Sequence, residues 1–484
     1  MTLTTMTPRL YQRDDLRVLA LAGMAAVLLG AASMLTGVAL ALALAVVVLF
    51  VTVAIRPVAA AYIYLAALPF VTGIGRGAVI PLLRPNEALQ ALLTAAVLAG
   101  LYVRFLQGET PHITFTRLDR ALLVLATLAS AWPLVWGLVR SHVPTSADVM
   151  STVPLWRYVA LYALYRFVAP EPKQVRRCMW ILLAGAAALA LIAALQSLNL
   201  LNLGTLWASE SAADSEGRGN ATLSSAIAVG DYLACSLAVV LAWALRSPSG
   251  RRPLLYITGG ILLVGALGSG QFSAWIGTLI VVVLVAAHEG QLRRLVTRAA
   301  PVAVIGVALT WPVVAKRLDG FGSGFGLPSS WIGRIDNLTN FYLPALGGFR
   351  WVLGVRPDSV LPAPETWRDV IYLESGLLWF LWVGGIPLLI GAVWFFRVAM
   401  RHTREIARRR SDDVGILALA TWSGLWVFAV LSLIDMHLTL RGAGDLLFIL
   451  LGLSSIRSPA PAAPPAETRQ PSAAPDSYVL AAEP

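Results

Sequence analysis

The sequence has few of the residues that cross-link or charge a soluble protein. Of its 484 residues, only 13% are charged, two are cysteines and five are histidines. Cys178 and Cys235 both fall within apolar stretches, so they predict neither a disulfide framework nor a metal site. A Walker A phosphate loop, a His-Glu-x-x-His zinc motif and a Cys-x-x-Cys pair are also absent. The sequence therefore offers no familiar motif for nucleotide, zinc or thiol chemistry.

Lysine is scarcer still. Only Lys173 and Lys316 are present among 37 basic residues, so the net charge of +11 rests on arginine. In a membrane protein a basic balance of this kind is typical of cytoplasmic loops. Binding of nucleic acid would need a basic soluble module, and the sequence contains none. We therefore expect no nucleic-acid partner.

What the sequence has in abundance is apolar residues, which make up 58% of it. They recur in long runs, and a run of about 18 or more is the length that a membrane helix needs. We predict an all-α fold, a polytopic membrane helical bundle of about 14 spans, or of 12 if the short sixth and ninth segments do not cross. The predicted spans are residues 17–34, 38–55, 58–73, 87–103, 120–139, 155–168, 178–198, 226–245, 254–268, 272–287, 299–314, 371–396, 414–434 and 438–456.

The arginines predict which loops face the cytoplasm. With the N-terminus inside, 24 of the 37 basic residues fall in inner loops, as the positive-inside rule requires. The first apolar run lacks a cleavage site and is predicted to be a retained anchor. The predicted divisions are a cytoplasmic N-terminus (1–16), spans 1–11 (17–314), a large extracytoplasmic loop (315–370), spans 12–14 (371–456) and a disordered cytoplasmic tail rich in proline and alanine (457–484).

Two outer segments, 199–225 and 315–370, are too long to be simple turns, and long loops in compact proteins are usually functional or disordered. The larger one is rich in aromatic residues, which argues for a folded cap over the bundle. These aromatic residues are Trp331, Phe341, Tyr342, Phe349, Trp351 and Trp367.

Outer-face arginines are the most informative polar residues. Each alone is typical of a headgroup contact, but together they predict a cationic cluster at one membrane face. A guanidinium group binds phosphate oxygens with two parallel hydrogen bonds, so a lipid diphosphate at the membrane surface is the predicted ligand. The members are Arg218, Arg317, Arg334, Arg350, Arg356 and Arg368.

The outer-face acids could supply a base. If residues 369–376 are helical, Asp369, Tyr372 and Gly376 share one stripe and Glu374 points elsewhere. An acid at the end of a membrane helix is costly, so both a functional role and an ion pair with Arg334 or Arg350 remain open. We expect His437, in the short outer turn Asp-Met-His, to be a residue of the rim.

Several short stretches of the second half follow one another in a recognisable order. An arginine in a small-residue stretch comes first, and a Ser/Gly-rich turn between two spans follows. An arginine ahead of an aromatic helix, a Gly-Val turn and a span that opens on Tyr-Leu-Glu-x-Gly complete the series. These stretches are GRGNATLSSAIAVGDYLA, ALGSGQFSAWIG, GRIDNLTNFYLPAL, WVLGVRP and IYLESGLLWFL. Over about residues 199–390 this order resembles the bacterial O-antigen ligases and the O-antigen and exopolysaccharide polymerases.

The resemblance implies roles for particular residues. Arg218 and Arg334 match the two arginines that hold the diphosphate of the donor. Arg317 and Arg356 are predicted to be further substrate-binding residues because they belong to the cluster of outer-face arginines. The ligases carry a histidine before the Tyr-Leu pattern, whereas this sequence has Arg368 and Asp369 there. That departure weighs against a ligase, and it leaves the identity of the catalytic base undecided. In this hypothesis Arg368 faces the diphosphate and Asp369 faces the acceptor hydroxyl, while Glu374 is structural.

The resemblance implies a glycosyltransferase of the bacterial cytoplasmic membrane, with both termini inside. It would transfer a polyprenyl-diphosphate-linked oligosaccharide to an acceptor glycan, free or lipid-linked, at the outer face. Arginines would stabilise the departing diphosphate, and an aspartate would orient or deprotonate the acceptor. No cofactor or metal is expected, because no cluster of outer-face acids could hold an ion. Membrane lipids and polysaccharide-assembly proteins are the other expected partners.

Two other classes of function stay open. A flippase for lipid-linked oligosaccharides, or another transporter, suits a chain with many spans. A single large outer loop and the lack of internal repeats weigh against it. A membrane assembly protein without catalysis is the third possibility.

Overall fold

The computed structural model describes residues 23, 27, 37–78, 83–109, 114–168, 171–204, 207, 218–247, 250, 252–319, 329–364 and 370–456. The described residues are mostly helical, with 78% helix and 2% strand. The predicted tail, and the predicted first span apart from residues 23 and 27, lie outside the described residues. So do Arg368 and Asp369.

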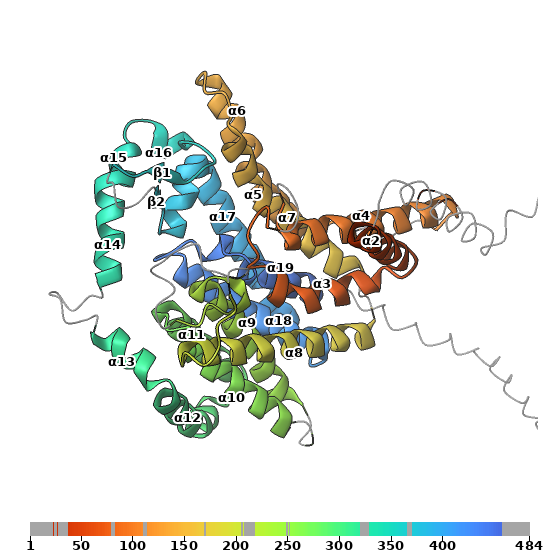
Figure 1. The fold of residues 1–484 in the computed structure, drawn as a ribbon, viewed down its shortest axis with the longest axis vertical. Coiled ribbons are helices and arrows are strands. Elements are labelled where there is room, and N and C mark those ends of the chain that lie inside the picture. The colour runs from red at the N-terminus through yellow and green to blue at the C-terminus, as the bar shows by residue number, and fades with distance from the viewer. Residues whose placement is uncertain are drawn as a thin grey trace, which may run out of the picture.

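The helices and strands run in the following order (Figure 1). The first group is α2 (Val38–Ile55), α3 (Val58–Val71), α4 (Pro85–Leu106), α5 (Arg117–Leu128), α6 (Ala131–Val139), α7 (Ser146–Val168), α8 (Pro172–Ser197), η3 (Ala221–Leu223), α9 (Ala226–Arg246), α10 (Arg252–Gly268), α11 (Phe272–His288), α12 (Leu292–Leu309) and α13 (Trp311–Asp319). The second group is α14 (Ser329–Asn337), the π-helix η5 (Leu338–Tyr342), α15 (Leu343–Ala345), α16 (Arg350–Leu353), β1 (Val360–Pro362), β2 (Val370–Tyr372), α17 (Gly376–Arg409), α18 (Asp413–Leu431), η6 (His437–Thr439) and α19 (Ala443–Ser454).

Several apolar helices suggest a membrane protein. Within the described ranges, six segments are long and apolar enough to cross a membrane, and five further apolar helices are shorter, at 10–17 residues. The six are Pro85–Leu106, Arg117–Val139, Pro172–Ser197, Ala226–Arg246, Gly376–Arg409 and Asp413–Leu431. The prediction of a mainly helical, membrane-type chain is thus confirmed in its coarse form. The predicted number of about 14 spans is not confirmed.

Helix α9 is the centre of the bundle. In its most apolar stretch, 94% of the residues are buried, and it packs against α8, α10, α11, α18 and α19. Small residues allow this close packing: a Cβ added at Gly230 would lie 2.3 Å from the Ala274 Cβ. The hydrophobic effect does not drive helices together within a membrane. Small residues at helix contacts let the backbones come close enough for van der Waals packing to hold them.

The connections between helices gather at two ends. At one end, the Gly73 N–H donates to the Thr222 carbonyl at 3.1 Å, and the Gly376 N–H donates to the Ser432 carbonyl at 2.9 Å. We call it the cap end, and it carries residues 218–225, 269–271, 329–364, 370–375 and 432–442. The opposite end is held by ion pairs such as Arg246–Glu289, at 2.7 Å.

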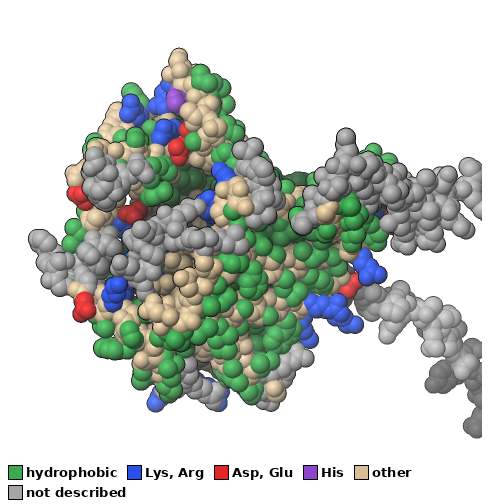
Figure 2. All heavy atoms as spheres, in the orientation of Figure 1, with side chains coloured by type: hydrophobic (Ala, Val, Ile, Leu, Met, Phe, Trp, Pro, Cys, Tyr) green, Lys and Arg blue, Asp and Glu red, His purple; other side chains and the backbone are tan. Residues whose placement is uncertain are grey.

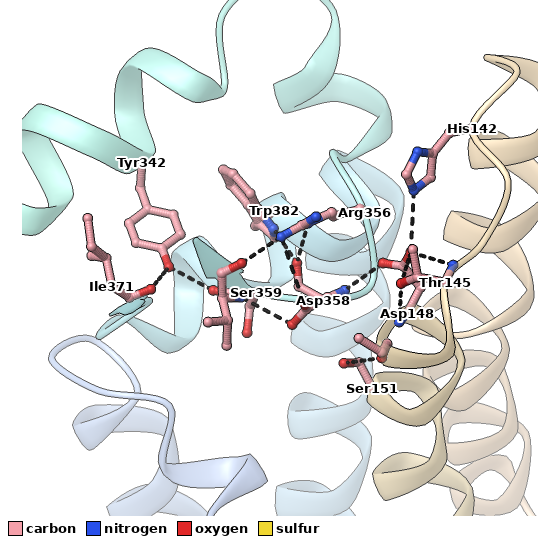
Figure 3. A network of polar contacts seen from close by, with 12 residues as sticks. His142, Thr145, Asp148, Ser151, Tyr342, Arg356, Asp358, Ser359, Ile371 and Trp382 are labelled. Atoms are coloured by element: carbon pink, nitrogen blue, oxygen red, sulfur yellow. Dashed lines mark hydrogen bonds and ion pairs between the residues drawn. The ribbon is translucent and has the colours of Figure 1, made fainter. Parts of the chain in front are cut away.

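Residues 329–364 and 370–375 form a small cap that is joined to the bundle (Figure 3). Strands β1 and β2 pair antiparallel, with Leu361 opposite Ile371. The Tyr342 Oη lies 2.7 Å from the carbonyl oxygens of both Ser359 and Ile371, so its single proton serves one of them at a time. The Trp382 indole of α17 donates to the Asp358 carbonyl at 3.0 Å. The described part of the large loop is therefore folded.

A second contact joins the cap to the start of α7. Asp148 accepts hydrogen bonds from the Thr145 hydroxyl at 2.8 Å and from the Asp358 N–H at 3.4 Å, and it lies 3.3 Å from His142 Nε2. Burial alone would raise the pKa of Asp148, but these donors lower it. Figure 2 shows basic, acidic and histidine side chains close together on the face where the cap and α6 meet.

The structure corrects the helical stripe expected over residues 369–376. Residues 370–372 form strand β2, and α17 begins only at Gly376, where the Ser375 side chain caps the Leu378 N–H. Val370, Ile371 and Tyr372 are β-branched or aromatic residues that favour a strand, and a serine cap favours a helix start after them. Tyr372 and Gly376 therefore do not share a helix face, and Asp369 lies outside the described residues.

Candidate functional site

A pocket of about 180 Å³ lies at the cap end, between the cap and the ends of α17 and α18. Its walls come from α14, η5, the β2–α17 connection and the α18–α19 connection. The lining residues are Trp331, Arg334, Ile335, Asn337, Leu338, Tyr342, Leu373, Glu374, Ser375, Leu433 and Ile434. The pocket thus combines one cation and one carboxylate with a mainly apolar wall.

Arg334 is the cation of this pocket, and 22% of its side chain is exposed. Its Nη2 lies 3.0 Å from Asp435 Oδ2, and its Nη1 donates to the Ile434 carbonyl at 3.3 Å. Glu374 is farther away, with 3.7 Å between Glu374 Oε2 and Arg334 Nε. The guanidinium group is therefore held firmly on the Asp435 side and loosely on the Glu374 side, which faces the pocket.

Glu374 was expected to be structural, and an ion pair with Arg334 was one of the two hypotheses for an acid in this region. Its contact with Arg334 agrees with that ion pair. Glu374 also lines the pocket, and 31% of its side chain is exposed. This carboxylate can therefore approach a ligand as well as balance the charge of the arginine.

A buried acid–histidine pair lies beside the pocket wall. His437 Nδ1 is 2.6 Å from Asp231 Oδ2, and neither side chain is more than 1% exposed. His437 follows Asp435 by two residues, and the charges of Asp435 and Arg334 both act on it. Burial would lower the pKa of His437, but the Asp231 carboxylate raises it above its usual value.

The expectation for His437 was therefore wrong. It is a buried residue of the α18–α19 connection, and its contact with Asp231 joins this connection to α9. The pairing is favourable because a buried carboxylate without a partner would be costly. The pattern of outer-face arginines and acids did not predict a role for Asp231 or Asp435. Asp231 lies inside an apolar span, and an acid in such a place is a signal that the sequence does carry.

Arg218 and Arg317 meet at a different point of the cap end, the turn between α10 and α11. The Arg317 Nε donates to the Gly270 carbonyl at 2.5 Å. A Cβ added at Gly270 would lie 3.8 Å from Arg218 Cγ and 3.9 Å from Arg317 Nε. Within the described residues, the buried side-chain nitrogens of Gln271 and Trp275 have no hydrogen-bond partner. Donors of hydrogen bonds therefore gather around this turn.

The other predicted residues are placed as follows. Arg356 donates to the carbonyls of Asp358 and Val360, at 3.2 and 2.6 Å, and so holds its own loop. Arg368 and Asp369 lie outside the described residues. The structure brings Arg218 together with Arg317, and Arg334 together with Glu374 and Asp435. The convergence of Arg218 with Arg334 in one site stays a prediction.

No family model and no curated protein sequence matches the chain. The residues and their geometry are therefore the basis for assigning a function.

Proposed function

We propose that the protein is a membrane glycan polymerase or ligase. It transfers a polyprenyl-diphosphate-linked oligosaccharide to an acceptor sugar at the outer face of a bacterial cytoplasmic membrane. The observation that carries the proposal is the pocket at Arg334. It joins a guanidinium group to apolar walls at the ends of two helices that are long enough to cross a membrane.

The ligand that suits such a pocket is an amphiphile with an anionic head. Arg334 has one edge occupied by Asp435 and Ile434 and the other only loosely contacted by Glu374. A phosphate oxygen that replaced the 3.7 Å contact with Glu374 would gain a charge-assisted hydrogen bond. The apolar residues Trp331, Leu338 and Leu433 would then lie beside the first carbons of the lipid.

The reaction needs stabilisation of a leaving group rather than a strong nucleophile. The bond between the anomeric carbon and the diphosphate oxygen breaks, and the acceptor oxygen forms a new bond at that carbon. Positively charged donors fixed around the diphosphate stabilise the charge that develops on it. Arg334 fills this role in the proposal, and Arg218 and Arg317 at the Gly270 turn offer a second group of donors.

The proton of the acceptor hydroxyl must go to a base. Asp369 remains a candidate from the sequence. Glu374 is a second candidate, because it lines the pocket and is partly exposed. A general base typically contributes about 10²–10⁴ in rate, so the two can be distinguished by separate amide substitutions.

Deletion of the gene in the native host tests the proposal. Chain length of the surface polysaccharide and the sidedness of lipid-linked intermediates would be measured. Accumulation of single lipid-linked units on the outer face supports the proposal, and rescue by the wild-type chain but not by Arg334→Ala would link the effect to the pocket. Accumulation on the inner face would instead indicate a flippase, and unchanged polysaccharide would contradict both.

A further inference from the structure

A long groove runs between α17 and α18, outside the candidate site. It has a volume of about 430 Å³. Its walls are apolar, with Leu389, Val393 and Phe396 from α17 and Trp422, Trp426 and Ala429 from α18. Both helices are among those that are long and apolar enough to cross a membrane. The groove is therefore open to the acyl chains of a bilayer if these helices span it.

Three arginines line the end of this groove that lies away from the cap. Arg397, Arg401 and Arg404 are spaced by four and three residues, which places them on one face of α17. All three are exposed. The Arg404 guanidinium lies over the Trp422 ring, 5.7 Å from its centroid.

The charge of these arginines is not balanced by any residue of the groove wall, because no aspartate or glutamate is among the residues that line the groove. Within the described part of the chain, Arg397 and Arg401 have no ion pair or hydrogen bond. Glu405, four residues after Arg401, pairs with Arg409 instead. Like charges at this helical spacing repel one another, so an anion between them would stabilise the arrangement.

We propose that the α17–α18 groove binds an anionic phospholipid. Its phosphate lies between Arg397, Arg401 and Arg404, and an acyl chain follows the apolar walls toward the cap. A zwitterionic lipid fits less well, because its own ammonium group would face three uncompensated cations. Basic pockets between membrane helices are known to select anionic headgroups in this way. The site is separate from the pocket at Arg334 and does not depend on the proposed function.

Binding to the purified full-length protein in mild detergent tests this site. Native mass spectrometry would count the lipids retained, and thermal unfolding would report stabilisation. The probes are phosphatidylglycerol, phosphatidylcholine with the same chains, and glycerol 3-phosphate as the headgroup without chains. We expect at least tenfold preference for phosphatidylglycerol over phosphatidylcholine. Stabilisation by glycerol 3-phosphate equal to that by phosphatidylglycerol would overturn the acyl-chain part of the site.

The triple change Arg397→Gln, Arg401→Gln and Arg404→Gln removes the charge. Each arginine beside an anionic lipid contributes roughly fivefold to affinity, so binding of phosphatidylglycerol should weaken roughly 100-fold. The single change Arg401→Gln, which leaves the helix nearly unaltered, should weaken it about fivefold. Arg293→Gln with Arg294→Gln on α12 is the matched control, because it removes exposed arginines that do not line the groove.

Equal binding by the wild type and the triple variant would overturn the proposal, and so would equal loss in the α12 control. A stable dimer that does not respond to phosphatidylglycerol would also overturn it, since the groove would then be an interface between two copies.

Discussion

Arg334 is the side chain on which the candidate site depends most directly. Replacing it with lysine keeps the positive charge but removes the planar group that contacts Asp435, Ile434 and Glu374 together. An ammonium group cannot make the two parallel hydrogen bonds that a phosphate accepts from arginine. We expect Arg334→Lys to reduce glycan transfer about 10–100-fold, which corresponds to loss of one charged hydrogen bond. Transfer by the purified protein from a lipid-linked donor, the activity proposed above, is the measurement.

Arg140→Lys provides the control for that change. Arg140 is not a member of the predicted cationic cluster, is exposed, and donates to the Val355 carbonyl of the cap at 2.6 Å. Its substitution should leave transfer within about twofold of the wild type. Equal losses in the two variants would show that general cap structure, rather than the pocket at Arg334, governs the rate.

Asp369 remains a candidate base on sequence grounds. Asp369→Asn keeps the shape of the side chain and removes its ability to accept a proton. If Asp369 deprotonates the acceptor, single-turnover transfer with pre-bound donor should fall by about 10²–10⁴ while donor binding is kept. If it only pairs with an arginine, stability and donor affinity should fall together. Near-normal transfer under these conditions would leave Glu374→Gln as the next variant to measure.

The buried pair of His437 and Asp231 predicts a pH dependence of stability. The pKa of His437 is raised in the folded protein, because the attraction of Asp231 outweighs the effect of burial. The folded state therefore holds the proton more tightly than the unfolded chain. The stabilisation by the protonated His437–Asp231 pair is fully present below about pH 6.5, the ordinary pKa of histidine in an unfolded chain. It is lost as the pH rises through the raised pKa of His437 in the folded protein.

Thermal unfolding in detergent between pH 6 and 9 tests this. The wild type should lose stability toward high pH, and His437→Gln should be less stable at low pH with a flatter profile. His142→Gln is the control, because His142 is partly exposed and lies near Asp148 instead. If His437→Gln shows the same slope as the wild type, the pair does not titrate as proposed.

At the scale of elements, the bend in α17 joins the bundle to the cap. Gly385 interrupts the helix with φ of +64°, and Pro387 follows two residues later. Beside this bend, the Val355 N–H of the cap donates to the Trp382 carbonyl at 2.6 Å. A glycine and a proline are the usual causes of a helix kink. The position of the bend therefore follows from the sequence, and the cap packs against the bend.

Gly385→Ala should destabilise the protein. The added Cβ would lie only 2.1 Å from the Val352 carbonyl oxygen, and the positive φ disfavours any side chain. We expect a loss of about 2–3 kcal/mol, typical of overpacking combined with backbone strain. The lower midpoint of thermal unfolding would report it.

Gly333→Ala is the matched control for the same chemical change. A Cβ at Gly333 would meet nothing within 4 Å, and the residue lies within α14. Alanine is favoured over glycine inside a helix by up to about 1 kcal/mol. The variant should be as stable as the wild type or slightly more so. Equal destabilisation at both positions would contradict the contact between α16 and α17.

At the scale of the whole molecule, the two ends of the bundle should face opposite sides of the membrane. The cap end carries Ser329, and Ser411 lies between α17 and α18 at the opposite end. Single cysteines at these two positions should be labelled from opposite sides by a reagent that does not cross the membrane. Cys178 and Cys235 are buried, so they should add little background. Labelling of both positions from the same side would overturn the predicted orientation.

Much of the helical organisation could be predicted from apolar periodicity. The predicted segment 38–55 has the bounds of α2, and 226–245 differs from α9 by one residue. The predicted span 120–139 lies within the apolar segment Arg117–Val139, which is interrupted only briefly between α5 and α6. The predicted span 299–314, by contrast, falls across α12 and α13. Hydropathy measures the length of an apolar run, but a change of helix direction within it depends on packing against other elements.

Amino-acid sequence alone determined that the chain is apolar, mainly helical and rich in arginine at the ends of its helices. Each of these properties is local, because composition and periodicity act within a single segment. Tertiary structure decided which distant residues meet. Asp231 and His437 lie 206 positions apart, and Arg334 of α14 contacts Asp435 of the α18–α19 connection. Such pairs form because burial leaves an isolated charge too costly, and only the folded chain shows which partner lies within reach.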